Sequence, residues 1–322
     1  GKASAIHFKN VSNSSISNNI ISNPRGLSPR AIDLLPQASG NDSISVSEVT
    51  ISGNQITGYK NDPIWVRAWA VDASSSVTMT DINIINNTIS ANCNLVLAWK
   101  ASDTATLENL TVIGNSFTVK DPKGKGTAVY LIGVGGTSCF SDNSITITGF
   151  IMNSDSYFDG VEIVGTTSGQ LTIANNVING NNVGSTSAGI FLEIPSSYVE
   201  VTGNKVTGWA TGILSGAPDS TSIEIHSNCI FGNSCGIDNY GSVSIDATLN
   251  YWGYESGPYH ATLNLDGQGN SVSGNVEFIP WYTDEDCSIP SSNGLEKTML
   301  TEAIVEDIIV TFDGNGGTPE TA

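Results

Sequence analysis

The sequence predicts an all-β chain, folded as a right-handed parallel β-helix, a solenoid of about eight to nine coils with a short C-terminal extension. Three observations predict it. A short motif recurs along the 322 residues, β-branched residues alternate with polar ones on both sides of each copy, and no stretch between copies has the 3.6-residue period of an amphipathic helix. Crossover connections between parallel strands are right-handed by default.

The repeated motif centres on an asparagine, as in VTISGNQI and LTIANNVI. Asparagine tolerates a left-handed backbone, so each copy describes a strand that bends and continues as another strand. The intervals shorten from 35 residues to 22, so the longer coils carry extra loops. Coils stacked ~4.8 Å apart would superpose these residues as a buried ladder of side-chain amides. The anchor asparagines are Asn19, Asn54, Asn87, Asn115, Asn143, Asn176, Asn204, Asn228 and Asn250.

Each coil also contains a second strand, which begins after a Gly or Ala. Aliphatic residues flanking the anchors, such as Ile173 and Val201, should stack in the core. If the aliphatic residues of the second strand also point inward, the residues between them form two outward columns. One column is Asp33, Trp65, Val96, Tyr130, Glu162, Phe191, Leu214 and Asp238. The other is Arg67, Ala98, Ile132, Val164 and Glu193.

Composition excludes several classes of protein. A formal charge of −19 would repel a phosphate backbone, so nucleic acid is not an expected partner. No run of eighteen apolar residues exists, so no membrane insertion is expected. The five cysteines form no C-x-x-C pair, which indicates small core residues with room for one bridge rather than a zinc site. Cys93 and Cys235 should be about five coils apart, too far to bond.

The closing segment carries a family resemblance. Asn250-Tyr251-Trp252-Gly253, Glu255-Ser256-Gly257-Pro258 and the run 272–281 resemble the end of many secreted β-helix surface proteins. With the coil repeat, residues 4–282 resemble the pectin-lyase-like superfamily, and more closely its copper-processing-type β-helix repeats. The resemblance implies a parallel β-helix that is secreted or displayed at the cell surface. It implies no particular reaction.

The expected domain organisation has three parts. Residues 1–282 form the β-helix, and 283–307 read as an acidic linker because charges and Pro290 interrupt the strand pattern. Residues 308–322 contain VTFDGNGGTP, which resembles the opening strand and turn of the Listeria–Bacteroides repeat. That resemblance implies a piece of a longer surface polypeptide with further domains.

The outward columns combine aromatic rings with carboxylates, and loops such as 57–62, 120–127, 150–159 and 179–187 would wall a groove over them. Sugars bind in this way, with rings stacked on apolar faces and hydroxyls bonded to acids. The candidate catalytic residues are Glu162, Glu193, Asp155 and Asp159. The candidate substrate-binding residues are Trp65, Arg67, Trp69, Trp99, Tyr130 and Phe191. Glu162 and Glu193 fall in adjacent coils, a spacing suited to two carboxylates flanking a glycosidic bond.

Plainer explanations stay open, since acids are common on so acidic a surface and outward aromatics can form a ladder without function. We expect an extracellular module that binds a glycan or cell-envelope polymer. One alternative is a carbohydrate-active enzyme, a glycoside hydrolase before a polysaccharide lyase, because Arg67 and Lys100 lack the cluster of Asp that a calcium-dependent lyase needs. Another alternative is a structural spacer. No cofactor is expected, and a structural Ca²⁺ has no clear motif.

Overall fold

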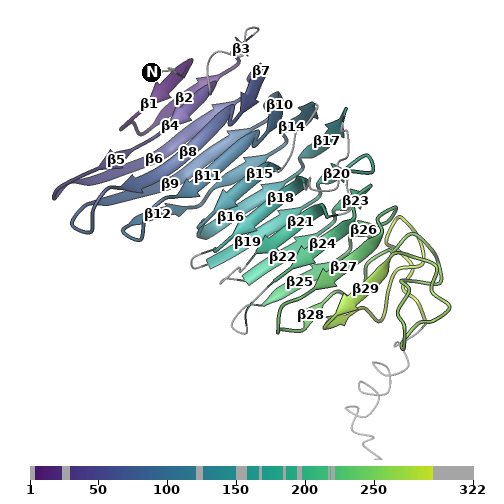
Figure 1. Ribbon diagram of the computed structural model, residues 1–322. Coiled ribbons are helices and arrows are strands. Elements are labelled where there is room, and N and C mark those ends of the chain that lie inside the picture. The colour runs from purple at the N-terminus through teal and green to yellow at the C-terminus, as the bar shows by residue number, and fades with distance from the viewer. Residues whose placement is uncertain are drawn as a thin grey trace, which may run out of the picture.

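The computed structural model describes residues 4–23, 30–120, 126–149, 158–166, 169–183, 186–193, 198–216, 218 and 222–292. Within these residues the chain is all-β, without a helix, and winds into a parallel β-solenoid of about seven turns with three parallel sheets (Figure 1). No helix in the described part of the chain could therefore cross a bilayer.

The three sheets, named A, B and C here, each take one strand from successive coils. Sheet A contains, in spatial order, β1 (Ile6–Phe8), β4 (Ile32–Leu34), β8 (Ile64–Ala70), β11 (Val96–Lys100), β15 (Gly126–Ile132), β18 (Phe158–Val164), β21 (Ala188–Glu193), β24 (Thr211–Ser215), β27 (Cys235–Asn239) and β29 (Ser271–Gly274), with β5 (Gln37–Ala38) beside β8. Sheet B contains β2 (Ser14–Ser17), β6 (Ser43–Ser52), β9 (Ser76–Ile85), β13 (Thr111–Ile113), β16 (Gly136–Ser141), β19 (Gly169–Ala174), β22 (Tyr198–Thr202), β25 (Ile223–His226), β28 (Ile245–Asp246) and β30 (Val276–Glu277), with β12 (Ala105–Glu108) beside β9. Sheet C contains β3 (Ile20–Ser22), β7 (Gln55–Asn61), β10 (Thr88–Cys93), β14 (Ser116–Lys120), β17 (Ser144–Thr148), β20 (Val177–Asn179), β23 (Lys205–Thr207) and β26 (Cys229–Ile230).

The expected count of eight to nine coils is too high, because it gave every asparagine anchor a full coil. The coils at the ends are incomplete. After Asn250 the strand of sheet C is reduced to a single bridge between Cys229 and Tyr251. Sheet C accordingly has eight strands. The chain makes one turn between each strand and the next, which gives seven turns.

The predicted core is confirmed. Ile173 of β19 and Val201 of β22 are fully buried and stand in register with each other. The inward residues of all three sheets are mostly Ile, Val and Leu, and they belong to one continuous cluster along the solenoid. β-Branched side chains suit this position because they pack well on a pleated surface.

The predicted asparagine ladder is confirmed along the corner between sheets B and C. Asn143 shows the pattern: its backbone N–H and its Nδ2 both donate to Asn176 Oδ1, at 2.9 and 3.1 Å, and its Nδ2 also donates to the Val112 carbonyl at 2.9 Å. The same donation to the next coil repeats from Asn19 to Asn250. Each amide thus satisfies buried backbone groups of the turn that it closes.

Glycines mark the entry to sheet A in the C-terminal half. A Cβ on Gly189 would lie 2.7 Å from the Gly212 carbonyl, and one on Gly212 would lie 2.6 Å from the Gly236 carbonyl. A side chain has no room between coils here. At the end of the row Trp252, which is fully buried, covers Gly236 and closes the core.

Candidate functional site

The outward face of sheet A carries the predicted column, with one correction. Strand pairing aligns Asp33, Trp65, Leu97, Tyr130, Glu162, Phe191, Leu214 and Asp238 in successive coils. Val96 is therefore wrong as a member, and Ala98 is wrong in the second column, where Trp99 stands between Arg67 and Ile132. The sequence alignment failed in this coil because an aliphatic residue, Leu95, stands where other coils have Ala31 or Ala128, so the pattern places the first inward residue at Leu95 instead of Val96.

An acidic cluster occupies the middle of this face. Asp159 and Glu162 come from β18 and Glu193 comes from β21. Glu193 is in register with Val164, two residues beyond Glu162 on the neighbouring strand, so the two glutamates are diagonal neighbours. Three carboxyl groups therefore lie within two adjacent coils.

Two of these carboxyl groups are buried and already hold hydrogen bonds. Glu162 Oε2 accepts from Thr127 Oγ1 of β15 at 2.6 Å. Asp159 Oδ1 accepts from the Ala188 N–H of β21 at 2.7 Å. Burial raises the pKa of Asp159 to about 7, and the negative charges of Glu162 and Glu193 add to that shift. Burial also raises the pKa of Glu162, against the opposing effect of the Thr127 hydroxyl.

A second cluster lies in the N-terminal coils of the same face and joins aromatic rings to arginines. The Arg67 guanidinium lies 3.8 Å from the ring centre of Trp69, and 5.2 Å from those of Trp65 and Trp99. Arg30 covers Trp65 at 3.1 Å. These cation–π contacts gather the predicted Trp65, Arg67, Trp69 and Trp99 into one group.

Trp65 is the least open member of this aromatic–arginine cluster. It is 8 % exposed, because Arg30 lies over its ring. Arg30 is in turn held by Asp33, 3.7 Å away, and Asp33 also contacts His7 at 3.3 Å. Trp69 and Trp99 are half-buried, and each residue is more exposed than Trp65.

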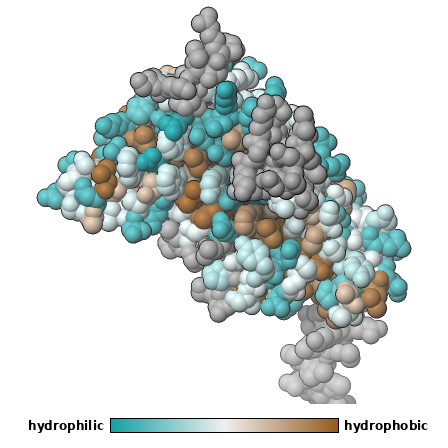
Figure 2. Space-filling view, viewed as in Figure 1, coloured by the Kyte–Doolittle hydropathy of each residue, from teal (hydrophilic) through white to brown (hydrophobic). Residues whose placement is uncertain are grey.

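Tyr130 and Phe191 extend the column between and beyond the two clusters. Tyr130 is in register with Leu97 on one side and with Glu162 on the other, and Phe191 follows Glu162 in the next coil. Both side chains are half-buried. Apolar side chains gather along the middle of the molecular face drawn in Figure 2, among hydrophilic ones.

Some residues of the expected site lie outside the described part of the chain, and others belong to a strand rather than a loop. Asp155 lies outside the described residues, as do 150–157 and 121–125 of the expected groove walls. Residues 57–61, expected in a loop, belong to β7. The described residues contain no group of three or more His, Cys, Asp or Glu side chains placed to hold a metal ion.

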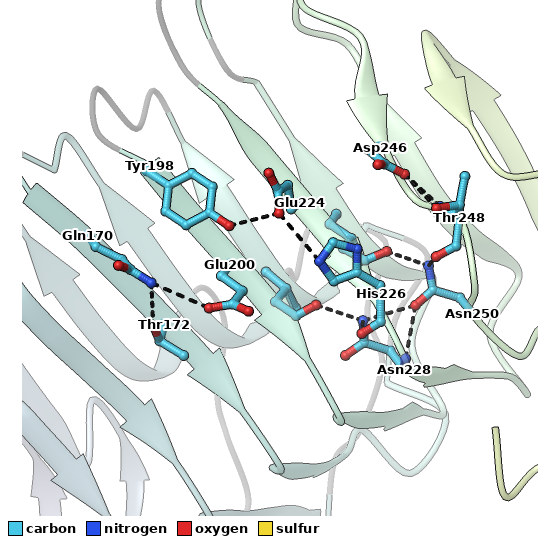
Figure 3. A network of polar contacts seen from close by, with 12 residues as sticks. Gln170, Thr172, Tyr198, Glu200, Glu224, His226, Asn228, Asp246, Thr248 and Asn250 are labelled. Carbon is cyan, nitrogen blue, oxygen red and sulfur yellow. Dashed lines mark hydrogen bonds and ion pairs between the residues drawn. The ribbon is translucent and has the colours of Figure 1, made fainter. Parts of the chain in front are cut away.

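Sequence reasoning missed an acidic row on sheet B. Glu200, Glu224, Asp246 and Glu277 stand directly in register on β22, β25, β28 and β30. Figure 3 shows the first three, with Glu224 accepting from Tyr198 Oη at 2.8 Å. The repeat contains the signal, since Glu200, Glu224 and Asp246 each stand four residues before an anchor asparagine.

An open pocket of about 580 Å³ also lies at the C-terminal end, lined by residues that include Tyr254, Gln268 and Trp281. It is distant in sequence from both clusters of sheet A.

Comparisons with protein families, with curated proteins and with solved structures found no match to this chain.

Proposed function

We propose that the outward face of sheet A binds an extracellular glycan or cell-envelope polymer, as part of a secreted or cell-surface module. The observation that carries the proposal is the alignment of aromatic rings with a hydroxyl-bonded carboxyl group, that of Glu162, in one column from Trp65 through Tyr130 to Phe191. A polysaccharide presents apolar ring faces and hydroxyls at regular intervals, so a column of this kind complements it.

Charge favours a neutral polymer. The middle of the sheet A face carries Asp159, Glu162 and Glu193, and the chain has a formal charge of −19. A polyuronate would be repelled there, whereas neutral sugar hydroxyls donate to carboxylates.

The proposal also includes further domains of a longer surface polypeptide, which the resemblance of residues 308–322 implies.

Glycoside hydrolysis is the second candidate, and one observation favours it. With a pKa of about 7, Asp159 keeps a substantial protonated fraction at neutral pH, and a general acid needs the protonated state. Against this, the Asp159 carboxyl is 3 % exposed and bonded to the Ala188 N–H, a contact that joins adjacent coils. Glu193 is half-buried and Glu162 is 8 % exposed, so both are more open to a sugar than Asp159 is.

A glycan array combined with a reducing-end assay tests the proposal. Binding without turnover supports a binding module, and turnover supports the hydrolase. If the array shows no binding and the assay shows no turnover, the result favours a structural spacer and contradicts the proposal.

Variants of the two glutamates separate the two classes further. If the protein is an enzyme, Glu162→Gln or Glu193→Gln should lower the rate by several orders of magnitude. If it is a binding module, the same variants should keep turnover at background and weaken affinity about tenfold, the loss expected for one charged hydrogen bond.

A further inference from the structure

We propose that Cys229 and Cys287 form a disulfide bond, which fastens the C-terminal loop, residues 281–292, to the last strand of sheet C. Their Sγ atoms lie 3.7 Å apart, although 58 residues separate them in sequence. A disulfide needs a separation of roughly 2.05 Å, so the two sulfur atoms must approach each other further for the bond to form. The other three cysteines have no such neighbour among the described contacts.

The loop presents Cys287 to Cys229 through a defined local structure. Ser291 N–H donates to the Trp281 carbonyl at 2.7 Å, and Thr283 N–H donates to the Ile289 carbonyl at 2.9 Å, which closes the loop on itself. The Asp284 carboxylate accepts from Ile289 N–H and from Ser288 Oγ, both at 2.7 Å. Cys287 stands inside this closed loop rather than on an open tail.

The solenoid holds the loop against the end of the asparagine ladder. Tyr282 N–H donates to the Asn250 carbonyl at 3.0 Å, and Trp281 is buried. Lys205, which is in register with Cys229, forms an ion pair with Glu285, and the Cys229 thiol donates to the Glu285 carbonyl at 3.0 Å. The thiol donation ends when the disulfide forms, but the other contacts persist and hold the loop beside Cys229.

The two thiols differ in reactivity. The hydrogen bond from the Cys287 thiol lowers the pKa of Cys229, and the Lys205 charge acts in the same direction. The contact with Cys229 and burial raise the pKa of Cys287. Cys229 is therefore the thiol that ionises first and attacks.

The co-reactant is a small-molecule disulfide such as oxidised glutathione. The Cys229 thiolate attacks one of its sulfurs, and the leaving glutathione thiolate takes up the proton that Cys229 released. The Cys287 thiol then loses its proton and attacks the Cys229 sulfur of the mixed disulfide, and the second glutathione leaves and takes up that proton. Two protein thiols are oxidised, and one glutathione disulfide is reduced to two thiols.

The cross-link would secure the cap of the solenoid. A terminal coil exposes unpaired strand edges, so the segment that covers it decides whether the end frays or pairs with another molecule. A bond that closes the chain from 229 to 287 also reduces the freedom of the unfolded state. Oxidation should therefore raise the unfolding temperature and slow proteolysis of the C-terminal loop.

Peptide mapping by mass spectrometry of the native chain, after treatment with oxidised glutathione, tests the proposal. We expect the thiols that can be alkylated to fall from five to three, with a peptide containing Cys229 linked to one containing Cys287. Cys287→Ser should keep all four remaining thiols and lose the rise in unfolding temperature. Cys139→Ser, on sheet B, should keep both the cross-link and that rise.

Two results would overturn the proposal. One is that the oxidised native protein still has five free thiols. The other is that Cys229 or Cys287 is found joined to a different cysteine. Because the readout is a covalent bond, it is independent of glycan binding.

Discussion

The corner between sheets B and C and the outward face of sheet A are built from the same coils but use them differently. At the corner, every coil contributes an asparagine with the same hydrogen bonds, from Asn19 to Asn250. On sheet A, the residue type at the equivalent strand position changes from coil to coil. The column includes Trp65, Tyr130, Glu162 and Phe191. Repetition at the corner satisfies the backbone in each turn, whereas variation along sheet A makes one stretch of surface chemically different from the next. We therefore attribute stability to the uniform column, and we propose that the varied one carries recognition.

The largest effect should come from a charge placed among the uniform core columns. Ile173→Asp buries a carboxylate at a fully buried position with no partner, and we expect a loss of about 5 kcal/mol or more of unfolding free energy. Thr111→Asp, on an outward and half-buried position of β13, should change stability by no more than about 1 kcal/mol. Denaturant unfolding measures both. Equal losses in the two variants would contradict the assigned register.

Removal of one ladder amide should have the next largest effect. Asn176→Ala leaves the Asn143 N–H and Nδ2 without their acceptor, and the Phe140 carbonyl without a donor. Unsatisfied buried groups of this kind should cost about 2–4 kcal/mol. The matched control is Asn83→Ala, whose side chain makes an exposed contact with the Asp81 carbonyl; its loss should stay below about 1 kcal/mol. Urea unfolding compares the pair, and a control as destabilised as the ladder variant would remove the distinction.

The pH dependence of stability should reveal the buried acid of sheet A. Asp159 has a folded-state pKa of about 7, well above its unfolded value, so between pH 4 and 7 the folded state holds a proton that the unfolded state has lost. Stability should therefore fall as pH rises through this range, by on the order of a few kcal/mol. Asp159→Asn keeps an acceptor for the Ala188 N–H and should lack the part of this fall that Asp159 causes, while Glu162, whose pKa is also raised, still contributes. The difference between the two unfolding curves isolates the contribution, and parallel curves would show that Asp159 is ionised in the folded protein.

The smallest effects should appear in binding. Trp99→Ala or Tyr130→Ala removes a half-buried ring from the sheet A face and should weaken glycan binding by about 1–3 kcal/mol. Trp65 should contribute mainly through Arg30, which lies on its ring. Titration calorimetry with a glycan identified on the array measures each affinity. Affinities equal to that of the parent in both variants would place the binding surface elsewhere.

The sequence was sufficient for the features that repeat. The ladder and the core follow from the spacing of Asn176, Asn204 and their neighbours. A residue type that every coil requires recurs in the sequence once per coil, so its period can be recognised. The sheet A column was correct except at Val96, because Leu95 is aliphatic at the position where other coils have Ala31 or Ala128. The contact between Cys229 and Cys287 could not be read from the repeat, since Cys287 lies in a segment with no strand pattern that folds back onto the last coil. The position of Arg30 on Trp65 was also missed, because Arg30 lies before its strand and outside the repeated motif.

Binding by two glutamate variants on different faces tests the central claim most directly. Glu162 on sheet A and Glu224 on sheet B each accept a hydrogen bond from a hydroxyl of an adjacent coil. Thr127 donates to Glu162 at 2.6 Å, and Tyr198 donates to Glu224 at 2.8 Å. A glycan that the parent binds should be measured against Glu162→Gln and Glu224→Gln under identical conditions. We predict that Glu162→Gln weakens binding about tenfold while Glu224→Gln leaves the affinity of the parent unchanged. Equal affinities in all three proteins, or a loss confined to Glu224→Gln, would contradict the assignment of recognition to sheet A.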